Sequence, residues 1–264
     1  CENKDVNHIS FTGSVATGRL VQAAAAYNIV PVTLELGGKS PQLFFEDANL
    51  ENALPFLVNA GIQNGGQTCS ASSRILVHRS RYEEVVDRMA QKYKELIVRP
   101  AIDDGALGPL ISERQKTIVE DFIAKGKNLN LVAQGEIDSK APAKGHYVAP
   151  HLFSDVSEDH ILAKDEIFGP VQVIMPFDTE EEAIKIANGT DYGLVASIWT
   201  NDGARQMRLA KKLKSGQVFI NNYGAGGGVE LPFGGRGFSG HGREKGFEAL
   251  FGFSTLKTVA SYHQ

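Results

Sequence analysis

Strand-like and helix-like segments alternate along the whole chain, and this alternation restricts the possible folds more than anything else in the sequence. Near the start, a short strand at 8–12, an alanine-rich helix at 15–27 and a second strand at 31–36 predict a βαβ unit. Apolar runs typical of buried strands then alternate with segments whose apolar residues recur at helical spacing. Strands are expected at 42–45, 75–78, 171–175, 195–199 and 218–221, and helices at 50–62, 81–98 and 204–213. The pattern predicts an α/β fold, a mostly parallel sheet with flanking helices.

Signals at helix ends add detail. Three serine or threonine residues stand three positions before a glutamate or glutamine, a capping-box pattern that predicts a helix start: Ser80 with Glu83, Ser112 with Gln115, and Thr179 with Glu182. The helix at 204–213 ends in lysines and is followed by Gly216, which predicts a left-handed cap. The polar stretch 134–144 predicts a surface loop, and the glycine-rich stretch 224–228 is interpreted as a flexible loop rather than a phosphate cradle.

Composition favours a globular protein that acts on small molecules. Of the 264 residues, 42% are hydrophobic, enough to bury a substantial core. A net charge of −4 offers no basic surface for nucleic acid, and no apolar run reaches the roughly 18 residues of a membrane span. With only Cys1 and Cys69 present, we expect no disulfide framework and a reducing, cytoplasmic location. The first residues contain neither an initiating methionine nor a secretory signal, so the chain is expected to begin inside a longer protein.

Three features are candidates for chemistry, and each has an ordinary structural alternative. Cys69 lies in a polar, glycine-rich loop that suits a nucleophilic thiol, although an isolated cysteine is more often a small buried residue. Glu35 ends an apolar strand, at the sheet edge where α/β proteins bind ligands, although such a carboxylate can simply be solvated. The turn from Gly13 to Gly18, with Ser14, could hold a phosphate at the start of a helix, although such turns are often only structural. No metal site is predicted.

These features stand in a fixed order together with further motifs. The segment 35–39 (ELGGK) is followed by 66–69 (GQTC), which ends at Cys69. Other motifs lie at 11–14 (FTGS), 166–170 (EIFGP), 221–222 (NN) and 232–235 (PFGG). In sequence and order, these segments resemble the signature motifs of the aldehyde dehydrogenase superfamily. The resemblance covers essentially all of the chain and implies an aldehyde dehydrogenase-like fold.

The resemblance also implies a mechanism. In that family, the cysteine matching Cys69 attacks the aldehyde carbon, hydride passes from the hemithioacetal to the nicotinamide, and the resulting thioester is hydrolysed. The glutamate matching Glu35 activates the hydrolytic water, a task that favours a carboxylate whose pKa is raised by a partly apolar site. Its presence favours hydrolysis over acyl transfer to coenzyme A. The implied reaction is NAD(P)-dependent oxidation of an aldehyde to a carboxylic acid.

Binding residues follow by the same resemblance. Six residues match cofactor contacts: Gly13, Ser14 and Gly18 at the phosphates, Leu36 near the nicotinamide, and Glu166 with Phe168 at the nicotinamide ribose. Asn221 and Phe233 match residues near the substrate pocket, although both types are equally ordinary in structural positions. Gln115 is left out of the predicted site: the family often has a cofactor-contacting glutamine followed shortly by a lysine, whereas the positions after Gln115 are Lys116, Thr117 and Ile118, which does not establish that contact.

The implied organisation has three parts. Residues 1–38 match the end of the dinucleotide-binding domain, 39–240 the catalytic domain, and 241–264 an oligomerisation segment that pairs with a neighbouring subunit. We therefore expect a homodimer or homotetramer of the parent protein. Family members are much longer on the amino-terminal side, where the choice between NAD and NADP is made; NAD is favoured here. Two alternatives stay open for the chain itself: a cofactor-independent thiol esterase, or a non-catalytic oligomerisation fragment.

Overall fold

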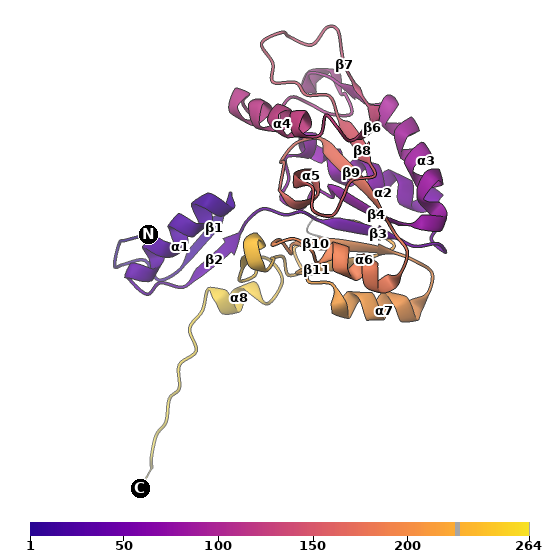
Figure 1. Cartoon of the computed structure of the whole chain (residues 1–264). Coiled ribbons are helices and arrows are strands. Elements are labelled where there is room, and N and C mark those ends of the chain that lie inside the picture. The colour runs from indigo at the N-terminus through magenta and orange to yellow at the C-terminus, as the bar shows by residue number, and fades with distance from the viewer. Residues whose placement is uncertain (225–227, 264) are drawn as a thin grey trace.

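The computed structural model of the chain describes residues 1–224 and 228–263 and contains a three-stranded and a seven-stranded β-sheet, besides one two-stranded pair (Figure 1). The smaller sheet holds β1 (Ile9–Thr12) and β2 (Val32–Glu35) in parallel, joined by α1 (Val15–Tyr27) as the predicted βαβ unit. Its third strand, β12 (Gly240–His241), comes from near the end of the chain and pairs antiparallel with β2. Sequence pattern alone does not reveal this long-range closure, because β12 has only two residues.

The larger sheet has seven strands in the order β11-β10-β3-β4-β9-β8-β6. All neighbouring pairs are parallel except β6 with β8, so the predicted mostly parallel sheet is confirmed. The strands are β3 (Pro41–Phe44), β4 (Arg74–His78), β6 (Asn130–Gln134), β8 (His151–Ser154), β9 (Val171–Phe177), β10 (Val195–Trp199) and β11 (Gln217–Ile220). A separate two-stranded pair joins β5 (Ile97–Val98) to β7 (Glu136–Ile137).

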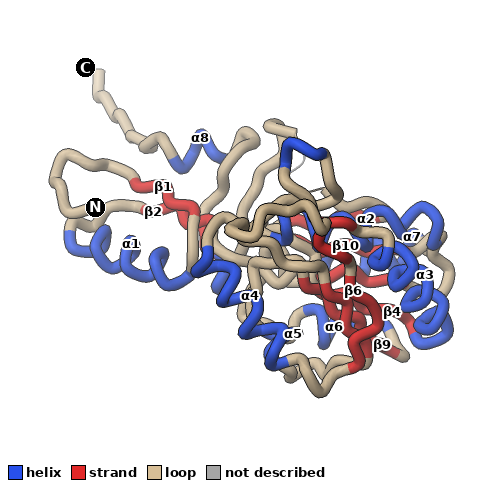
Figure 2. The backbone as a smooth tube through the Cα atoms, turned by 90° about the horizontal axis from the view of Figure 1, so that it is seen from above, coloured by secondary structure: helices blue, strands red, loops and turns tan. Residues whose placement is uncertain are grey.

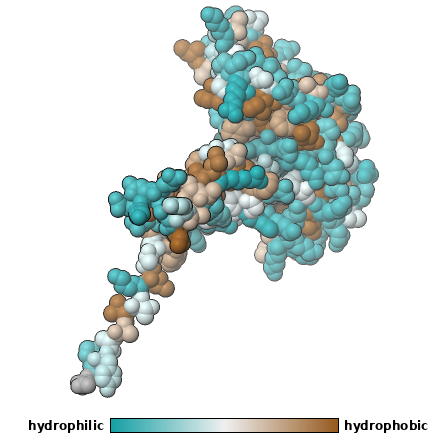
Figure 3. Space-filling view, turned by 60° about the vertical axis from the view of Figure 1, so that its left-hand side comes forward, coloured by the Kyte–Doolittle hydropathy of each residue, from teal (hydrophilic) through white to brown (hydrophobic). Residues whose placement is uncertain are grey.

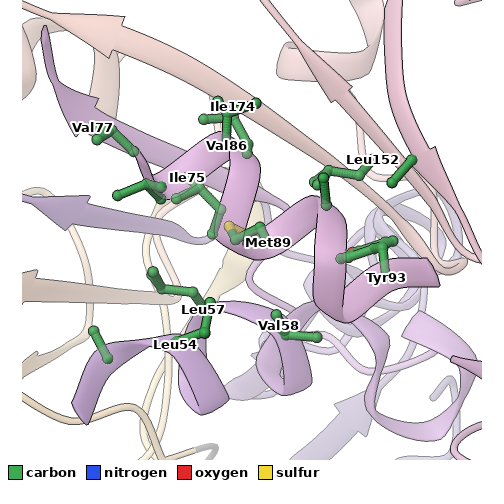
Figure 4. Packing of buried hydrophobic residues seen from close by; sticks show 14 of the residues in the cluster. Leu54, Leu57, Val58, Ile75, Val77, Val86, Met89, Tyr93, Leu152 and Ile174 are labelled. Carbon is green, nitrogen blue, oxygen red and sulfur yellow. The ribbon is translucent and has the colours of Figure 1, made fainter. Parts of the chain in front are cut away.

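Helices cover both faces of the larger sheet (Figure 2). One face packs against α2 (Leu50–Ile62) and α3 (Tyr82–Lys94); Figure 4 shows this core, in which Met89 and Leu57 of these helices meet Ile75 of β4. Residues that point the opposite way, such as Leu76, join the second core. That core is covered by α4 (Glu113–Lys125), α5 (Ile161–Lys164), α6 (Glu180–Ala187) and α7 (Gly203–Lys212). Because both faces are covered, the central strands are buried along almost their whole length.

Two of the three predicted capping boxes begin a helix. Ser112 and Thr179 are the N-caps of α4 and α6, and each side-chain oxygen accepts a hydrogen bond from the backbone N–H three residues later, at 3.2 Å. The third prediction is wrong. Ser80 lies inside a 3₁₀ turn (Arg79–Arg81), its backbone N–H donates to Nδ1 of His78, and α3 starts only at Tyr82. His78, the last residue of β4, bonds both the hydroxyl and the backbone N–H of Ser80, so that hydroxyl does not cap a helix and no capping box forms.

Other predicted boundaries are also wrong. Gly216 does not cap α7 in a left-handed conformation, because Leu213 leaves the helix in an extended one. The amide of Asn188 takes over the cap: it donates to Lys212 O (3.0 Å) and accepts from Lys214 N (2.7 Å). The helix predicted at 81–98 stops at Lys94, and the predicted helical residues Ile97 and Val98 form β5 instead. This strand pairs with β7, which lies inside the stretch 134–144 that was predicted to be a loop. The prediction for 224–228 concerns residues 225–227, which lie outside the described residues.

The end of the chain carries many exposed apolar side chains. The short helix α8 (Ala249–Gly252) and the extended stretch to residue 263 project from the smaller sheet, and Figure 3 shows hydrophobic side chains along this projection. Leu256 is 98% exposed and Val259 is 84% exposed. The predicted oligomerisation segment falls here and stays a prediction, as do the three domain boundaries. Within the described part of the chain, no helix is long and apolar enough to cross a membrane.

Candidate active site

A cavity of about 570 Å³ lies where the smaller sheet meets the larger one. Five segments form its wall: the turn after β1, the end of β2, the loop after α2, the first turn of α4, and the turn before β9. Its lining residues are Thr12, Gly13, Ser14, Glu35, Leu36, Gly37, Gln67, Thr68, Cys69, Gln115, Glu166 and Phe168. Seven of the ten residues predicted from sequence are therefore brought together around one cavity.

The loop that carries Cys69 is shaped by a sharp stop to α2. Asn64 and Gly65 adopt left-handed conformations (φ 54° and 65°), which turn the chain out of the helix. Gln67 then fixes the loop through four hydrogen bonds. Its Nε2 (3.0 Å) and its backbone N–H (3.2 Å) donate to Asn64 O, its Oε1 accepts from Ile111 N (2.9 Å), and its backbone oxygen accepts from Asn64 Nδ2 (3.0 Å). Cys69 is left half-buried at the cavity wall.

The surroundings of Cys69 do not favour a thiolate. Burial raises the pKa of its thiol, and the carboxylates of Glu166 and Glu35 raise it further. Backbone hydrogen bonds at Ser70 and Cys69 lower the pKa of the thiol only in part. The resting residue is therefore a thiol, and its reaction as a nucleophile requires a nearby group to accept its proton.

Glu35 places a buried carboxyl group on the wall of the same cavity. The residue is 1% exposed, and neither carboxylate oxygen has a hydrogen-bond partner among the described residues. Burial raises the pKa of Glu35 to about 8, helped by Glu244 and partly opposed by Arg243. An unpartnered buried carboxyl group is costly for folding, and such cost is typical of functional sites. The alternative of a simply solvated carboxylate at a strand end does not fit this burial.

The two glycines after Glu35 are required by close contacts. A Cβ on Gly37 would overlap the carboxylate of Glu166, and a Cβ on Gly38 would overlap the backbone oxygen of Cys69. The N–H of Gly38 donates to Oε1 of Glu166 (3.0 Å). This turn therefore touches both the loop that carries Cys69 and the carboxylate of Glu166, so its glycines set the relative positions of Glu35, Cys69 and Glu166.

We expect Gly38→Ala to lower the free energy of unfolding by about 2 kcal/mol or more, because the new methyl group must push the Cys69 loop away. The matched control is Gly203→Ala, at the first position of α7, where a Cβ meets nothing within 4 Å. Urea unfolding of both variants provides the measurement. Equal stability of the two variants would show that the loop yields freely and that this contact does not position Cys69.

The remaining cavity residues form a wall suited to a polar ligand. Ser14 is exposed and caps α1, so the amino end of that helix faces the same space. Phe168 has a left-handed backbone (φ 55°), which is uncommon for an aromatic residue. The side chain of Gln115 holds this turn by donating from Nε2 to Phe168 O (2.9 Å). Gln115 lines the cavity although it was not among the predicted site residues. Its contact with the 166–170 motif joins two distant segments, so sequence alone does not reveal it.

Three predicted residues lie outside the cavity wall. Gly18 is buried in α1, where a Cβ would meet Leu36 at 2.6 Å, so its missing side chain allows close packing beneath the cavity. Its cofactor role stays a prediction. The side-chain amide of Asn221 bonds the backbone of Thr200: Oδ1 accepts from Thr200 N and Nδ2 donates to Thr200 O, both at 3.0 Å. Phe233 is partly buried in the apolar cluster that also contains Cys69. A substrate role for Asn221 and Phe233 stays a prediction.

Comparison with known proteins gives consistent results. The model of the family described as "Aldehyde dehydrogenase family" matches residues 1–259. A betaine aldehyde dehydrogenase of Rhizobium johnstonii is 40% identical over 258 residues, which are 97% of this chain and 53% of that protein. A Burkholderia cenocepacia protein of known structure is 58% identical, with a TM-score of 0.96 over 98% of this chain and 55% of its own.

A second solved structure is the NAD⁺ complex of an aldehyde dehydrogenase from Bacillus cereus. It is 41% identical, with a TM-score of 0.92 over 98% of this chain and 52% of its own. The chain thus spans about half the length of the relatives it matches. From its sequence match and its fold, this chain belongs to the aldehyde dehydrogenase family.

Proposed function

We propose that this chain carries the nucleophile and the base of an NAD(P)-dependent aldehyde dehydrogenase, with Cys69 and Glu35 in these roles. One observation supports the proposal above all others. A half-buried thiol and a buried, unpartnered carboxyl group line the same cavity, between a helix amino end and a second carboxylate. Each of these groups taken alone has an ordinary structural explanation. Packing alone does not explain why all of them line the same cavity.

The cavity residues fit part of a dinucleotide. Helix amino ends bind phosphates, and Gly13 and Ser14 stand at the start of α1. The carboxylate of Glu166 can accept hydrogen bonds from ribose hydroxyls, and Leu36 with Phe168 supplies apolar wall. These residues would hold the nicotinamide half of NAD or NADP. NAD is the favoured cofactor, because relatives of known structure were solved as NAD⁺ complexes. When bound, it supplies the two-electron oxidation of the aldehyde carbon.

The first task of the protein is to form a covalent bond. Sγ of Cys69 attacks the carbonyl carbon of the aldehyde, and the thiol gives up its proton as the bond forms. Glu35 is the nearby buried carboxylate able to receive a proton, since its pKa of about 8 makes it a stronger base than an ordinary glutamate. Oxidation of the resulting hemithioacetal leaves an acyl group on Cys69 as a thioester.

The second task is to remove that acyl group. The proton that Glu35 took up in the first step passes to solvent, which restores its carboxylate form. Glu35 then accepts a proton from water, and the hydroxide so generated attacks the thioester carbon. The carbon–sulfur bond breaks, the carboxylic acid leaves, and Cys69 recovers its proton. Glu35 has no hydrogen-bond partner among the described residues, so its lone pairs are available to such a water.

The substrate proposed is a small aldehyde, and the parent protein is proposed to be a homodimer or homotetramer. A second function, cofactor-independent ester hydrolysis, is favoured by one specific observation: the thiol and the base both belong to this chain and share one cavity. NADH formation from NAD and a simple aldehyde tests the first function. Formation that requires Cys69 supports it, formation unchanged in Cys69→Ser contradicts it, and ester hydrolysis without NADH favours the second.

The rate of deacylation should rise with pH through about 8, because only the deprotonated form of Glu35 accepts a proton from water. The rate is measured by acylating the protein, removing excess reagent and following loss of the acyl group at each pH. Following a preformed thioester separates this step from the attack by Cys69, whose thiol pKa is also raised. A flat profile between pH 6 and 9 would contradict the role of Glu35.

A further inference from the structure

Tyr223 is a buried tyrosine that the mechanism above does not use. It lies just beyond β11, and 8% of the residue is exposed. Its backbone N–H donates to Oδ1 of Asn222 (2.8 Å), and the backbone oxygen of Asn222 accepts from Oγ of Ser197 in β10 (2.7 Å). The segment that carries Tyr223 is thus fixed to the larger sheet.

The ring of Tyr223 packs beside the proposed nucleophile. It belongs to a small apolar cluster with Leu194 and Val195, and the partly buried Cys69 packs against the same cluster. The hydroxyl of Tyr223 donates to the backbone oxygen of Ser70, the residue that follows Cys69. The two bonded residues are 153 positions apart in the chain, so a distant segment holds the loop that carries the thiol.

Cys69 and Ser70 are the two central residues of a tight turn. The backbone N–H of Ala71 donates to the oxygen of Thr68 (3.0 Å), which closes the turn. The backbone oxygen of Cys69 lies so close to Gly38 that an added Cβ would be 2.2 Å from it. The backbone oxygen of Ser70, by contrast, is held by a side chain, the tyrosine hydroxyl. Removing this hydroxyl therefore frees one side of the turn.

The backbone of Ser70 also acts on the thiol. Burial and the charges of Glu166 and Glu35 raise the pKa of the Cys69 thiol, and the backbone N–H of Ser70 makes one of the hydrogen bonds that lower it. A hydrogen bond of this kind favours the thiolate over the thiol. Its strength depends on the distance and angle at which the N–H meets Sγ, so a shift of the Ser70 backbone weakens it.

We propose that Tyr223 is a positioning residue for the nucleophile: its hydroxyl holds the Ser70 backbone so that the N–H of Ser70 stays directed at Sγ of Cys69. The proposal rests on the function proposed above, which makes Cys69 the nucleophile. Tyr223 is not among the residues that line the active-site cavity, so it acts through the loop. Burial raises the pKa of Tyr223 well above its usual value, and a charge on Cys69 raises it further, so the hydroxyl remains a donor while Cys69 titrates.

The pH dependence of Cys69 alkylation by iodoacetamide tests this proposal. The measurement uses the Cys1→Ser chain, in which Cys69 is the one cysteine left. Adding Tyr223→Phe should raise the pH of half-maximal rate by about 0.5 to 1 unit, because a weakened hydrogen bond from Ser70 makes the thiolate about three- to tenfold less favourable. The plateau rate at high pH should stay within about twofold, since the ring remains and the thiolate is the reacting form in both chains.

The matched control is Tyr82→Phe, which removes another buried tyrosine hydroxyl that donates to a backbone oxygen. Tyr82 is 6% exposed, its hydroxyl donates to Ile174 O (3.2 Å), and it does not line the cavity. Both substitutions should lower the urea concentration of unfolding, but Tyr82→Phe should leave the pH profile unchanged. An unshifted or lower half-maximal pH in Tyr223→Phe, or an equal shift in both variants, would overturn the proposal. Alkylation needs neither cofactor nor aldehyde, so its outcome is separate from a failure to form NADH.

Discussion

Replacing Cys69 with serine should lower the rate of p-nitrophenyl acetate hydrolysis by this chain on the order of a thousandfold or more. The ester needs no cofactor, so the assay isolates the thiol and the base. A serine hydroxyl is a far weaker nucleophile than a thiol, and the site offers Glu35 rather than a histidine to activate it. Release of p-nitrophenolate gives the rate.

The chain supplies its own control for this experiment. Cys1 is the other cysteine, and it is exposed at the amino terminus, away from the cavity wall. Cys1→Ser should leave the rate within about twofold of the wild-type rate. If Cys69→Ser retained full activity, or Cys1→Ser removed it, the nucleophile would lie elsewhere and the proposed function would fail.

Glu35→Gln should have a different signature, in which acylation continues and deacylation slows by about 10²- to 10⁴-fold. The amide is nearly isosteric but cannot accept the proton of water. Rapid mixing with p-nitrophenyl acetate should therefore give a burst of p-nitrophenolate close to one equivalent per chain, followed by a very slow steady rate. The wild-type chain should show a smaller burst.

The control for lost charge is Glu136→Gln, at an exposed position in β7. It should behave as the wild-type chain does, because the charge removed is solvated and remote from the cavity wall. A Glu35→Gln variant with unchanged deacylation would mean that water is activated by another group, and the buried carboxyl group would then need a different explanation.

The parts of the fold that sequence predicts well are those governed by local pattern. The helices α1 (Val15–Tyr27) and α2 (Leu50–Ile62) and the strand β10 (Val195–Trp199) have the predicted bounds. The first is an alanine-rich segment, the second has apolar residues at helical spacing and a stop at Asn64 and Gly65, and the third is a short apolar run. The predicted boundaries are wrong where a contact with a distant part of the chain determines the end of an element. Asn188 rather than Gly216 ends α7, and strand pairing with β7 shortens the helix before β5.

The sequence predicted which residues form the candidate site, but not how burial and charge shift their pKa values. The resemblance pointed to Cys69, Glu35 and Glu166, and these residues share the cavity. The burial of Glu35 depends on Gly234 and the segment around Glu244, which pack against it from far along the chain. A raised pKa of about 8 is a property of that packing, so no local motif reveals it.

Mass spectrometry of the Glu35→Gln chain after brief treatment with p-nitrophenyl acetate tests the central claim most directly. If Cys69 receives the acyl group and Glu35 is needed to remove it, the digest should contain one stable acetyl group on the peptide that holds Cys69, and the wild-type chain should lose this group within the same interval. An acetyl group on another residue, or one that leaves both proteins equally fast, would contradict the account.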